Sequence, residues 1–305
     1  MKNKIMVHAG LFHADDVLCV TMARILNENI AVERVYKVPE TVDEDTIIAD
    51  IGCGKYDHHQ ADTPLRRDGF PHCAASLMWE DEFGKEVVSL LHPTLNEEQV
   101  LSVVAGVDTM LLRSVAAIDN GCKTTKSQAG SQTLGSSDVY SLNSMVSMFN
   151  PCWNSDVNPN DAFMEAVDFA TMILKRMIAR LAASVEGEKI IADAVEKSTQ
   201  SNTPEIVVLP QFVPWQSFVC RNAAQALVMV YPAIRGGWNI QMVPVAVNSR
   251  DTRAVMPRSW YGLSDLSADK AMHGMTFCHK SGFMAAFKTK NDAPAAAYTV
   301  VGKTA

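Results

Sequence analysis

The first half of the chain alternates short apolar runs with longer segments in which apolar residues recur every three or four positions. Residues 4–7 and 46–51 are β-prone runs, and the second, which is apolar apart from Thr46 and Asp50, is ended by Gly52. A continuous apolar run is typical of a strand buried on both faces of a parallel sheet. Helical spacing appears at residues 17–26, 73–83 and 97–117. Strands alternating with helices predict an α/β domain with a doubly wound, mainly parallel sheet.

A polar stretch with one predicted helix, residues 141–149, separates this half from a long helical segment. Asn158 can cap that helix, Pro159 suits its first position, and an acidic residue favours its positive end. Apolar residues then recur at spacings of four and three as far as Leu181. We expect residues 158–185 to form a helix that connects two domains.

The pattern changes again in the last third of the chain. Residues 228–234 and 238–245 are β-rich and are separated by Arg235-Gly236-Gly237, which predicts a hairpin. A predicted helix and strand follow at residues 266–272 and 275–279. We therefore expect a smaller α+β domain over residues 186–305, after a first domain over residues 1–157.

Length and composition agree with two domains in an ordinary globular protein. The chain has 305 residues, of which 48% are hydrophobic and 20% charged. No stretch approaches the roughly 18 uninterrupted apolar residues of a membrane span, and the N-terminal residues do not resemble a signal peptide. The seven cysteines include no Cys-x-x-Cys pair, which favours reduced thiols and a cytoplasmic location.

Histidines and aspartates gather in three clusters of the predicted first domain. One spans residues 8–16 after the first strand, the second comprises Asp50 and residues 57–59 after the next clear strand, and the third is Asp119-Asn120-Gly121 after a helix. Because the carboxyl ends of strands meet at one edge of an open α/β sheet, these clusters can converge. Imidazole with carboxylate is a ligand set for Mn, Fe or Zn, and two ions can share a bridging carboxylate.

Each cluster alone has an ordinary explanation. Asp16 can cap the helix predicted from Val17, and Asp119-Asn120-Gly121 is a common turn sequence. A lone histidine such as His72 or His92 is usually a solvated or a core side chain. All the clusters together, in order and each next to a strand or helix end, predict a metal site instead.

These residues bring the chain close to a known family. The segments His8–Asp16, Asp50–Gly52 with Tyr56–Gln60, and Asp119–Gly121 resemble, in order, the motifs of the Myg-type exonucleases (the melanocyte-proliferating-gene family) within the DHH phosphoesterase superfamily. Segments 149–153, 257–263 and 279–283 are similar to its downstream signatures. The resemblance covers nearly the whole chain and implies a DHH-type catalytic domain followed by a substrate-binding domain.

The resemblance also implies residue roles. Two divalent metal ions would be bound by six residues: His8, His13, Asp15, Asp50, His58 and Asp119. His8, His13 and Asp50 would hold one ion, and Asp50 would bridge to the second. His59 would contact phosphate or donate a proton, and Asp57 would orient a histidine. The additional imidazole of His13 favours Mn²⁺ over Mg²⁺.

Substrate contacts are expected in the second domain. The net charge of −7 argues against a broad basic surface that coats nucleic acid, but a few arginines can hold phosphates locally. Five basic residues gather there: Arg250, Arg253, Arg258, His279 and Lys280. Arginine matches phosphate geometry, and the nearby Trp260 could stack on a base. A solvated basic loop and a core tryptophan explain the pattern equally well. The other four tryptophans are expected in the core.

These inferences lead to a manganese-dependent phosphodiesterase, a 3′–5′ exonuclease acting on single-stranded RNA or short oligonucleotides. The polarity and the preference for RNA come from the resemblance alone. One alternative is a phosphohydrolase for a small molecule such as pyrophosphate or a cyclic dinucleotide. Another is a catalytically weak nucleic-acid-binding protein. The sequence is compatible with a monomer or an oligomer.

Overall fold

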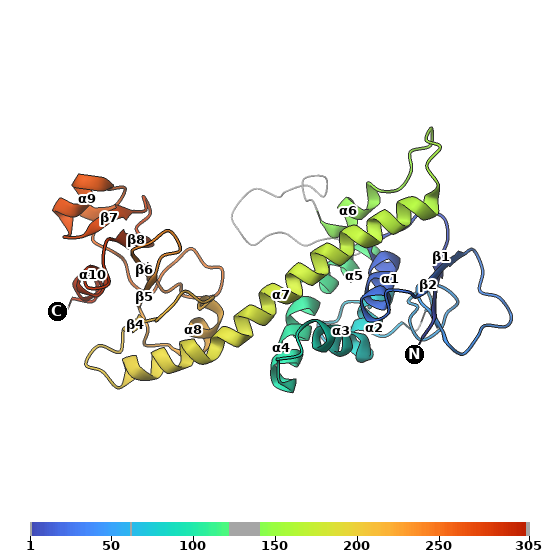
Figure 1. The fold of residues 1–305 in the computed structure, drawn as a ribbon, viewed down its shortest axis with the longest axis horizontal. Coiled ribbons are helices and arrows are strands. Elements are labelled where there is room, and N and C mark those ends of the chain that lie inside the picture. Colours follow the sequence, from blue (N-terminus) through green and yellow to red (C-terminus); the bar gives the residue numbers. More distant parts are fainter. Residues whose placement is uncertain (1, 62, 122–140, 303–305) are drawn as a thin grey trace. The chain divides into compact units, whose positions relative to one another are not determined.

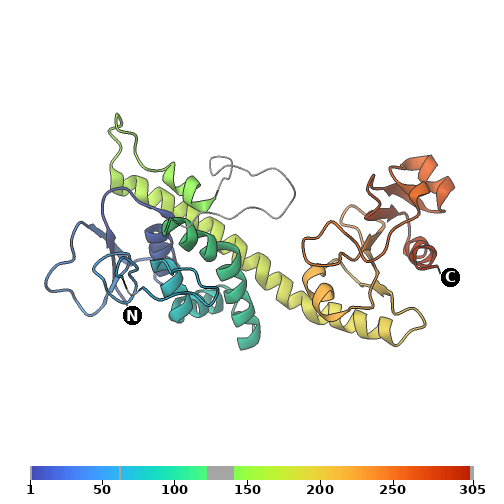
Figure 2. The same ribbon diagram turned by 180° about the vertical axis from the view of Figure 1, so that it is seen from behind.

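The computed structural model describes residues 2–61, 63–121 and 141–302. The chain divides into two compact units, residues 1–182 and 183–305. The boundary falls inside helix α7 (Pro159–Thr199), which can be followed without a break in Figure 1 and Figure 2. This helix ends later than the expected residue 185, because Ile191 and Ala194 pack into a core of the second unit.

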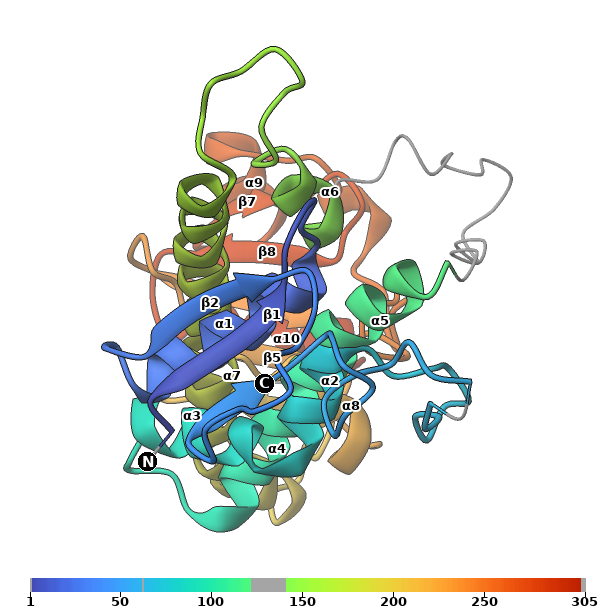
Figure 3. The same ribbon diagram turned by 90° about the vertical axis from the view of Figure 1, so that its right-hand side faces the viewer.

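The first unit contains a parallel sheet of three strands in the order β2–β1–β3. The central strand β1 (Lys4–His8) pairs with β2 (Ala31–Val35) on one side and with β3 (Thr46–Ile48) on the other. Helix α1 (Ala14–Leu26) packs against β1, and Figure 3 shows it behind the strands. The structure is thus mixed α/β with a parallel sheet. The doubly wound arrangement stays a prediction.

Strand β3 is shorter than the apolar run that predicted it. Its pairing with β1 ends at Ile48, and the backbone then bends at Asp50, whose φ is +55°. The amide of Asp50 donates to the carbonyl of Tyr56 at 2.8 Å. The run 46–51 therefore divides into a strand and a tight turn, and this turn places Asp50 at the end of the sheet.

Further helices of the first unit surround α1. Their bounds are α2 (Ala74–Met78), α3 (Gly84–Leu91), α4 (Glu97–Val107), α5 (Arg113–Asp119) and α6 (Leu142–Ser147). π-Helical turns at Trp79–Phe83 and Asp108–Leu112 join α2 to α3 and α4 to α5. The predicted helices at 73–83 and 97–117 are therefore confirmed as helical segments that contain π turns.

The segment Glu97–Asp119 is long and apolar enough to cross a membrane by length and composition, with a mean hydropathy of 1.6. A core helix passes the same test, so this observation is weak evidence for a membrane span. Val103, Val107 and Val115 of this segment are fully buried in the first unit, while 33% of its apolar window is buried. A helix with one face packed on a core shows such a pattern.

The second unit is built on a mixed sheet with the strand order β4–β5–β6–β8–β7. The strands are β4 (Ile206–Val208), β5 (Val228–Pro232), β6 (Trp238–Met242), β7 (Met275–Cys278) and β8 (Met284–Phe287). Only the β4–β5 pair is parallel. The predicted hairpin is confirmed as β5–β6. At its turn, Gly237 has a φ of +76°, and a Cβ there would lie 2.4 Å from the carbonyl oxygen of Phe287.

Both faces of this sheet are covered. Along β5, Val228 and Val230 belong to one core cluster with helix α10 (Asp292–Val300), while Met229 and Tyr231 belong to another with the end of α7 and α8 (Gln216–Asn222). Successive strand residues point to opposite faces, so an apolar run serves two cores. Helix α9 (Asp265–Ala271) completes the unit and confirms the helix expected at 266–272.

Candidate metal centre

The three clusters expected from the sequence meet at the carboxyl ends of β1 and β3. His8 is the last residue of β1, Asp50 follows β3, and Asp119 is the last residue of α5. They line a cavity of about 1200 Å³ together with the loop that carries His58 and His59. Helix α6 contributes serine and asparagine side chains to the cavity wall. The convergence expected at a sheet edge is therefore observed.

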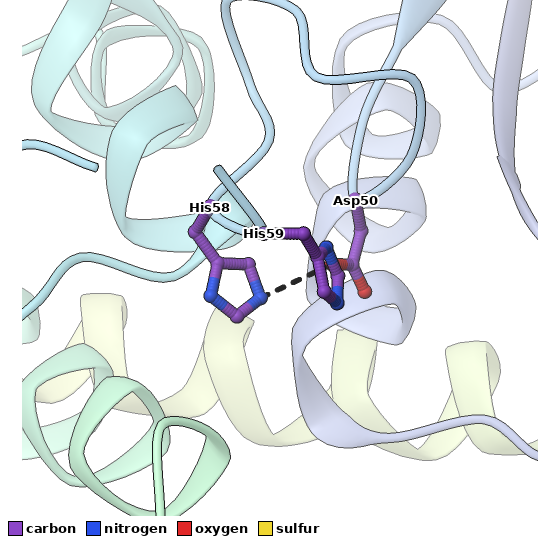
Figure 4. Close-up of side chains that lie close together, drawn as sticks. All are labelled: Asp50, His58 and His59. Atoms are coloured by element: carbon purple, nitrogen blue, oxygen red, sulfur yellow. Dashed lines mark ion pairs between the residues drawn. The ribbon is translucent and has the colours of Figure 1, made fainter. Parts of the chain in front are cut away.

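Three groups of side chains among the described residues could hold a metal ion. They are His8 with Asp16 and Asp50, Asp15 with His58 and Asp119, and Asp50 with His58 and His59. Within each group the potential ligand atoms lie within 4.8 Å of one another. Figure 4 shows the third group, in which the side chains of Asp50, His58 and His59 converge. Because Asp50 and His58 each belong to two groups, the groups form one continuous centre.

Asp50 lies between the two buried histidines. Its Oδ2 is 3.3 Å from Nε2 of His8, and its Oδ1 is 3.3 Å from Nε2 of His58. Nε2 of His58 also lies 3.0 Å from Oδ2 of Asp119. One carboxylate therefore presents one oxygen to each half of the centre, which is the arrangement that a bridging ligand needs.

Three atoms of this centre are buried and have no hydrogen-bond partner: Oδ2 of Asp16, Oδ1 of Asp50 and Nε2 of His58. Such an atom costs about 1–3 kcal/mol in a folded protein. Each of these atoms belongs to a residue of the three groups, and cations bound within the groups would satisfy them. The donor set of carboxylates and imidazoles thus fits a divalent metal ion.

The charges of the centre shift its pKa values. Burial raises the pKa of Asp15 well above its usual range and that of Asp16 to about 7. Burial opposes a charge on His8, but the carboxylates of Asp50 and Asp16 raise its pKa to about 9. Burial likewise opposes a charge on His58, yet its contacts with Asp119 and Asp50 raise its pKa to about 11. The metal-free centre therefore holds protons where a cation would otherwise neutralise the carboxylates.

The loop from Asp50 to His59 is held by Asp57. The buried carboxylate of Asp57 accepts the backbone N–H of Cys53 at 2.6 Å and that of His58 at 2.8 Å. It also lies 2.7 Å from Nδ1 of His59. Asp57 thus stands where a residue that orients a histidine is expected. The side chain of His59 itself is 60% exposed to the cavity side of the loop.

Asp15 is anchored by the start of helix α2. Its oxygens accept the backbone N–H groups of Ala74 and Ala75 at 2.8 and 2.7 Å. Amides at a helix N-terminus stabilise a negative charge, so they compensate part of the cost of burying this carboxylate. Its Oδ2 remains 3.5 Å from Nε2 of His58.

The ligand set differs from the expected one at two neighbouring positions. Helix α1 begins at Ala14, not at Val17, so Asp16 is not its N-cap. Oδ1 of Asp16 accepts the N–H of His13 at 2.9 Å, while Oδ2 lies 3.3 Å from Nε2 of His8. His13 is exposed on the cavity wall, with its ring centroid 5.9 Å from that of His8, and lies outside the three groups. Asp16 therefore joins the candidate ligands, and the role of His13 as a ligand stays a prediction.

The expected substrate contacts of the second unit need two corrections. The guanidinium of Arg253 donates to the carbonyls of Cys220, Ala223, Ala224 and Ala226, at 2.6–3.3 Å. These hydrogen bonds stabilise the end of α8 and the residues after it, so the guanidinium is not available to a substrate. Trp260 is 4% exposed and belongs to the core, so it cannot stack on a base.

The remaining predicted contacts of this unit are accessible. Arg250, Arg258 and Lys280 are exposed, and Nδ1 of His279 lies 2.8 Å from Oγ of Ser281. In the first unit, the expectation that Trp153 is a core residue is wrong, because its side chain is 97% exposed.

Comparison with known proteins gives relatives over nearly the whole chain. The MYG1 protein of Schizosaccharomyces pombe is 29% identical over 310 residues, which cover 94% of this chain and 93% of the relative. The proteins named MYG1 exonuclease from Homo sapiens and Mus musculus are each 25% identical, cover 95% of this chain, and are themselves covered to 83% and 82%. No solved structure matches. Residues 4–300 match the model of the MYG1 exonuclease family, described as "Uncharacterised protein family (UPF0160)", and the chain belongs to this family.

Proposed function

We propose that the chain is a metal-dependent phosphodiesterase that releases nucleotides from the 3′ end of single-stranded RNA or short oligonucleotides. The observation that carries the proposal is the carboxylate of Asp50, placed between two groups of buried ligands that leave atoms without hydrogen-bond partners. The exonuclease names of the human and mouse relatives support a nuclease-type function. The direction of cleavage and the choice of RNA rest on the family resemblance.

The fit of the ligands supports two divalent ions. His8, Asp16 and Asp50 would hold one, and Asp15, Asp50, His58 and Asp119 the other. The two imidazoles favour Mn²⁺ over Mg²⁺, which prefers oxygen ligands. Two bound ions supply an activated water and neutralise the oxygens of the reacting phosphate.

The chain itself supplies a group for proton transfer. With Nδ1 of His59 held by Asp57 at 2.7 Å, Nε2 of His59 is free to contact the substrate. A protonated ring in this orientation can give its proton to the leaving oxygen, and the carboxylate of Asp57 stabilises the charged ring before the transfer. The side-chain NH₂ of Asn143 on the cavity wall can donate to phosphate oxygens, whereas the hydroxyls of Ser144 and Ser147 donate to backbone carbonyls.

Two further assignments belong to the proposal. A DHH-type fold for the first unit is supported by the parallel sheet with ligands at its carboxyl end. A cytoplasmic location is supported by the scattered cysteines, and the six cysteines among the described residues are free thiols.

One observation favours a second candidate function. The metal centre lies wholly within the first unit, and Arg253 and Trp260 of the second unit are engaged in internal contacts. A phosphohydrolase for pyrophosphate or a cyclic dinucleotide needs fewer contacts beyond the centre than a nuclease does. The experiment must therefore distinguish a small-molecule phosphohydrolase from a nuclease.

A substrate panel with Mn²⁺ tests the proposal: linear single-stranded RNA, circular single strands, duplex DNA, cyclic dinucleotides and pyrophosphate. We expect mononucleotides from linear RNA and no cutting of circles. Faster hydrolysis of pyrophosphate or a cyclic dinucleotide than of any oligonucleotide would favour the second function.

The Asp50→Asn variant tests the assignment of the centre. Asparagine tolerates the positive φ of this position, so the turn is retained while the charge is lost. We expect turnover to fall by orders of magnitude, about 10³-fold or more, with less bound Mn²⁺. Normal turnover in a folded Asp50→Asn protein would refute the assignment of the centre.

A further inference from the structure

Asn120 directly follows the candidate ligand Asp119 and ends helix α5. We infer that Asn120 is a positioning residue that holds the His58 ring with a hydrogen on Nδ1, so that the lone pair of Nε2 faces the metal centre. The inference rests on the proposed function only in taking the centre to bind a metal ion.

The orientation of the Asn120 amide follows from its partners. Nδ2 of Asn120 donates to the carbonyl of His72 at 3.0 Å and to the carbonyl of Ala116 at 2.9 Å. Both partners can only accept, so the group that faces them must be the NH₂. The amide oxygen is then fixed on the side that faces His58.

This orientation determines the tautomer of the ring. Oδ1 of Asn120 lies 3.4 Å from Nδ1 of His58. An amide oxygen can only accept, so Nδ1 must carry the hydrogen, and in a neutral ring the lone pair is then on Nε2. Nε2 lies 3.0–3.5 Å from the carboxylates of Asp15, Asp50 and Asp119. The lone pair therefore points at the place where a metal ion would bind.

The chemistry of the two histidine partners differs in a way that matches their roles. His59, the proposed proton donor, contacts a carboxylate, Asp57. A carboxylate stabilises a charged ring. His58, a proposed ligand, contacts an amide, which fixes the ring without adding charge. A metal ligand must be a neutral imidazole, so a neutral partner suits it.

Asn120 also connects three segments that meet at the centre. Its side chain contacts the loop that carries His58, the residue His72 before α2, and the last turn of α5. A change at this position can therefore loosen the structure as well as the ring. The experiment must separate these two effects.

We propose to compare Asn120→Ala and Asn120→Asp with Asn222→Ala. Aspartate keeps an oxygen acceptor for His58 but loses both N–H donors. Asn222 is the control, because its Nδ2 also donates to a carbonyl four residues earlier, that of Phe218, and it lies in the second unit. Mn²⁺ affinity is measured by titration calorimetry, and folding by thermal melting of the metal-free proteins. The ring tautomer of His58 is read from the ¹⁵N shifts of its nitrogens in the protein loaded with diamagnetic Zn²⁺.

Asn120→Ala is expected to weaken Mn²⁺ binding about 10- to 100-fold, the usual effect of losing a residue that orients a metal ligand. Asn120→Asp is expected to keep the hydrogen on Nδ1 of His58, because a carboxylate oxygen also only accepts. Asn222→Ala should leave affinity unchanged. Equal affinity and an unchanged tautomer in Asn120→Ala would overturn the inference, as would an Asn120→Asp protein in which Nδ1 of His58 has lost its hydrogen.

The outcome separates this inference from the proposed function. A wild-type protein that binds Mn²⁺ but cleaves no phosphodiester would refute the proposed function and leave the role of Asn120 standing. A wild-type protein that cleaves RNA while Asn120→Ala binds Mn²⁺ equally well would do the reverse. Absence of Mn²⁺ binding by the wild-type protein would overturn both.

Discussion

Metal binding at this centre should release protons, and their number follows from the structure. The pKa of His8 is raised to about 9 and that of His58 to about 11, so both rings carry a second proton and a positive charge at pH 8 in the metal-free protein. A ligand imidazole must be neutral, so each ring loses that proton when a metal binds. We expect these two rings to release about two protons per chain when Mn²⁺ saturates the protein at pH 8.

The affinity of the centre for Mn²⁺ should rise with pH, because protons compete with the metal for the same ligands. A release of two protons corresponds to a roughly 100-fold gain in the product of the two binding constants per pH unit. At pH 6 the carboxyl of Asp16, with its pKa of about 7, should add about one more proton to the count.

Titration calorimetry in two buffers with different ionisation enthalpies measures the protons directly. The His8→Gln variant should release about one proton fewer at pH 8 than the wild type. His92→Ala, at the end of α3 and outside the centre, is the control and should match the wild type. A wild-type release of less than about one proton, or a count that does not depend on His8, would refute this account of the centre.

Other variants test separate parts of the structure. Arg253→Ala should destabilise the second unit by about 1–3 kcal/mol, seen by thermal melting, because carbonyls at the end of α8 and just after it lose their donor. Arg258→Ala should raise KM for oligonucleotides without a change in melting. Trp260→Ala should cost about 3–5 kcal/mol of stability, whereas Trp153→Ala should change it by less than about 0.5 kcal/mol. His59→Ala should lower kcat about 10²- to 10⁴-fold at unchanged bound Mn²⁺; an unchanged kcat would remove His59 from proton transfer.

The strands and helices that the sequence predicted each have a regular pattern of apolar residues. The run around Ile5 and the amphipathic stripe of α7 were recognisable because they are buried on two faces and on one face, respectively. Strand β2 was not predicted. Its sequence Ala-Val-Glu-Arg-Val mixes charged and apolar residues, as expected of an edge strand with partial exposure. Strands β4 and β8 are too short to show a period.

The centre was largely predictable because its residues follow strand and helix ends. The position of Asp16 in the centre was not predictable, since it depends on where helix α1 begins. Helix α1 begins three residues earlier than expected, so Asp16 lies in its first turn and directs Oδ2 at His8. Arg253 was misassigned for a different reason. Its partners lie about thirty residues earlier in the chain, and local sequence does not reveal such tertiary contacts.

The left-handed backbone at Asp50 restricts which residues this chain can carry as its central ligand. Short polar side chains tolerate a φ of +55°, whereas longer or β-branched ones are strained there. A glutamate would reach further but would also have to hold this turn, at a cost of about 1–3 kcal/mol. Evolution or design that seeks a different metal preference therefore has more freedom at the outer ligands than at the shared carboxylate.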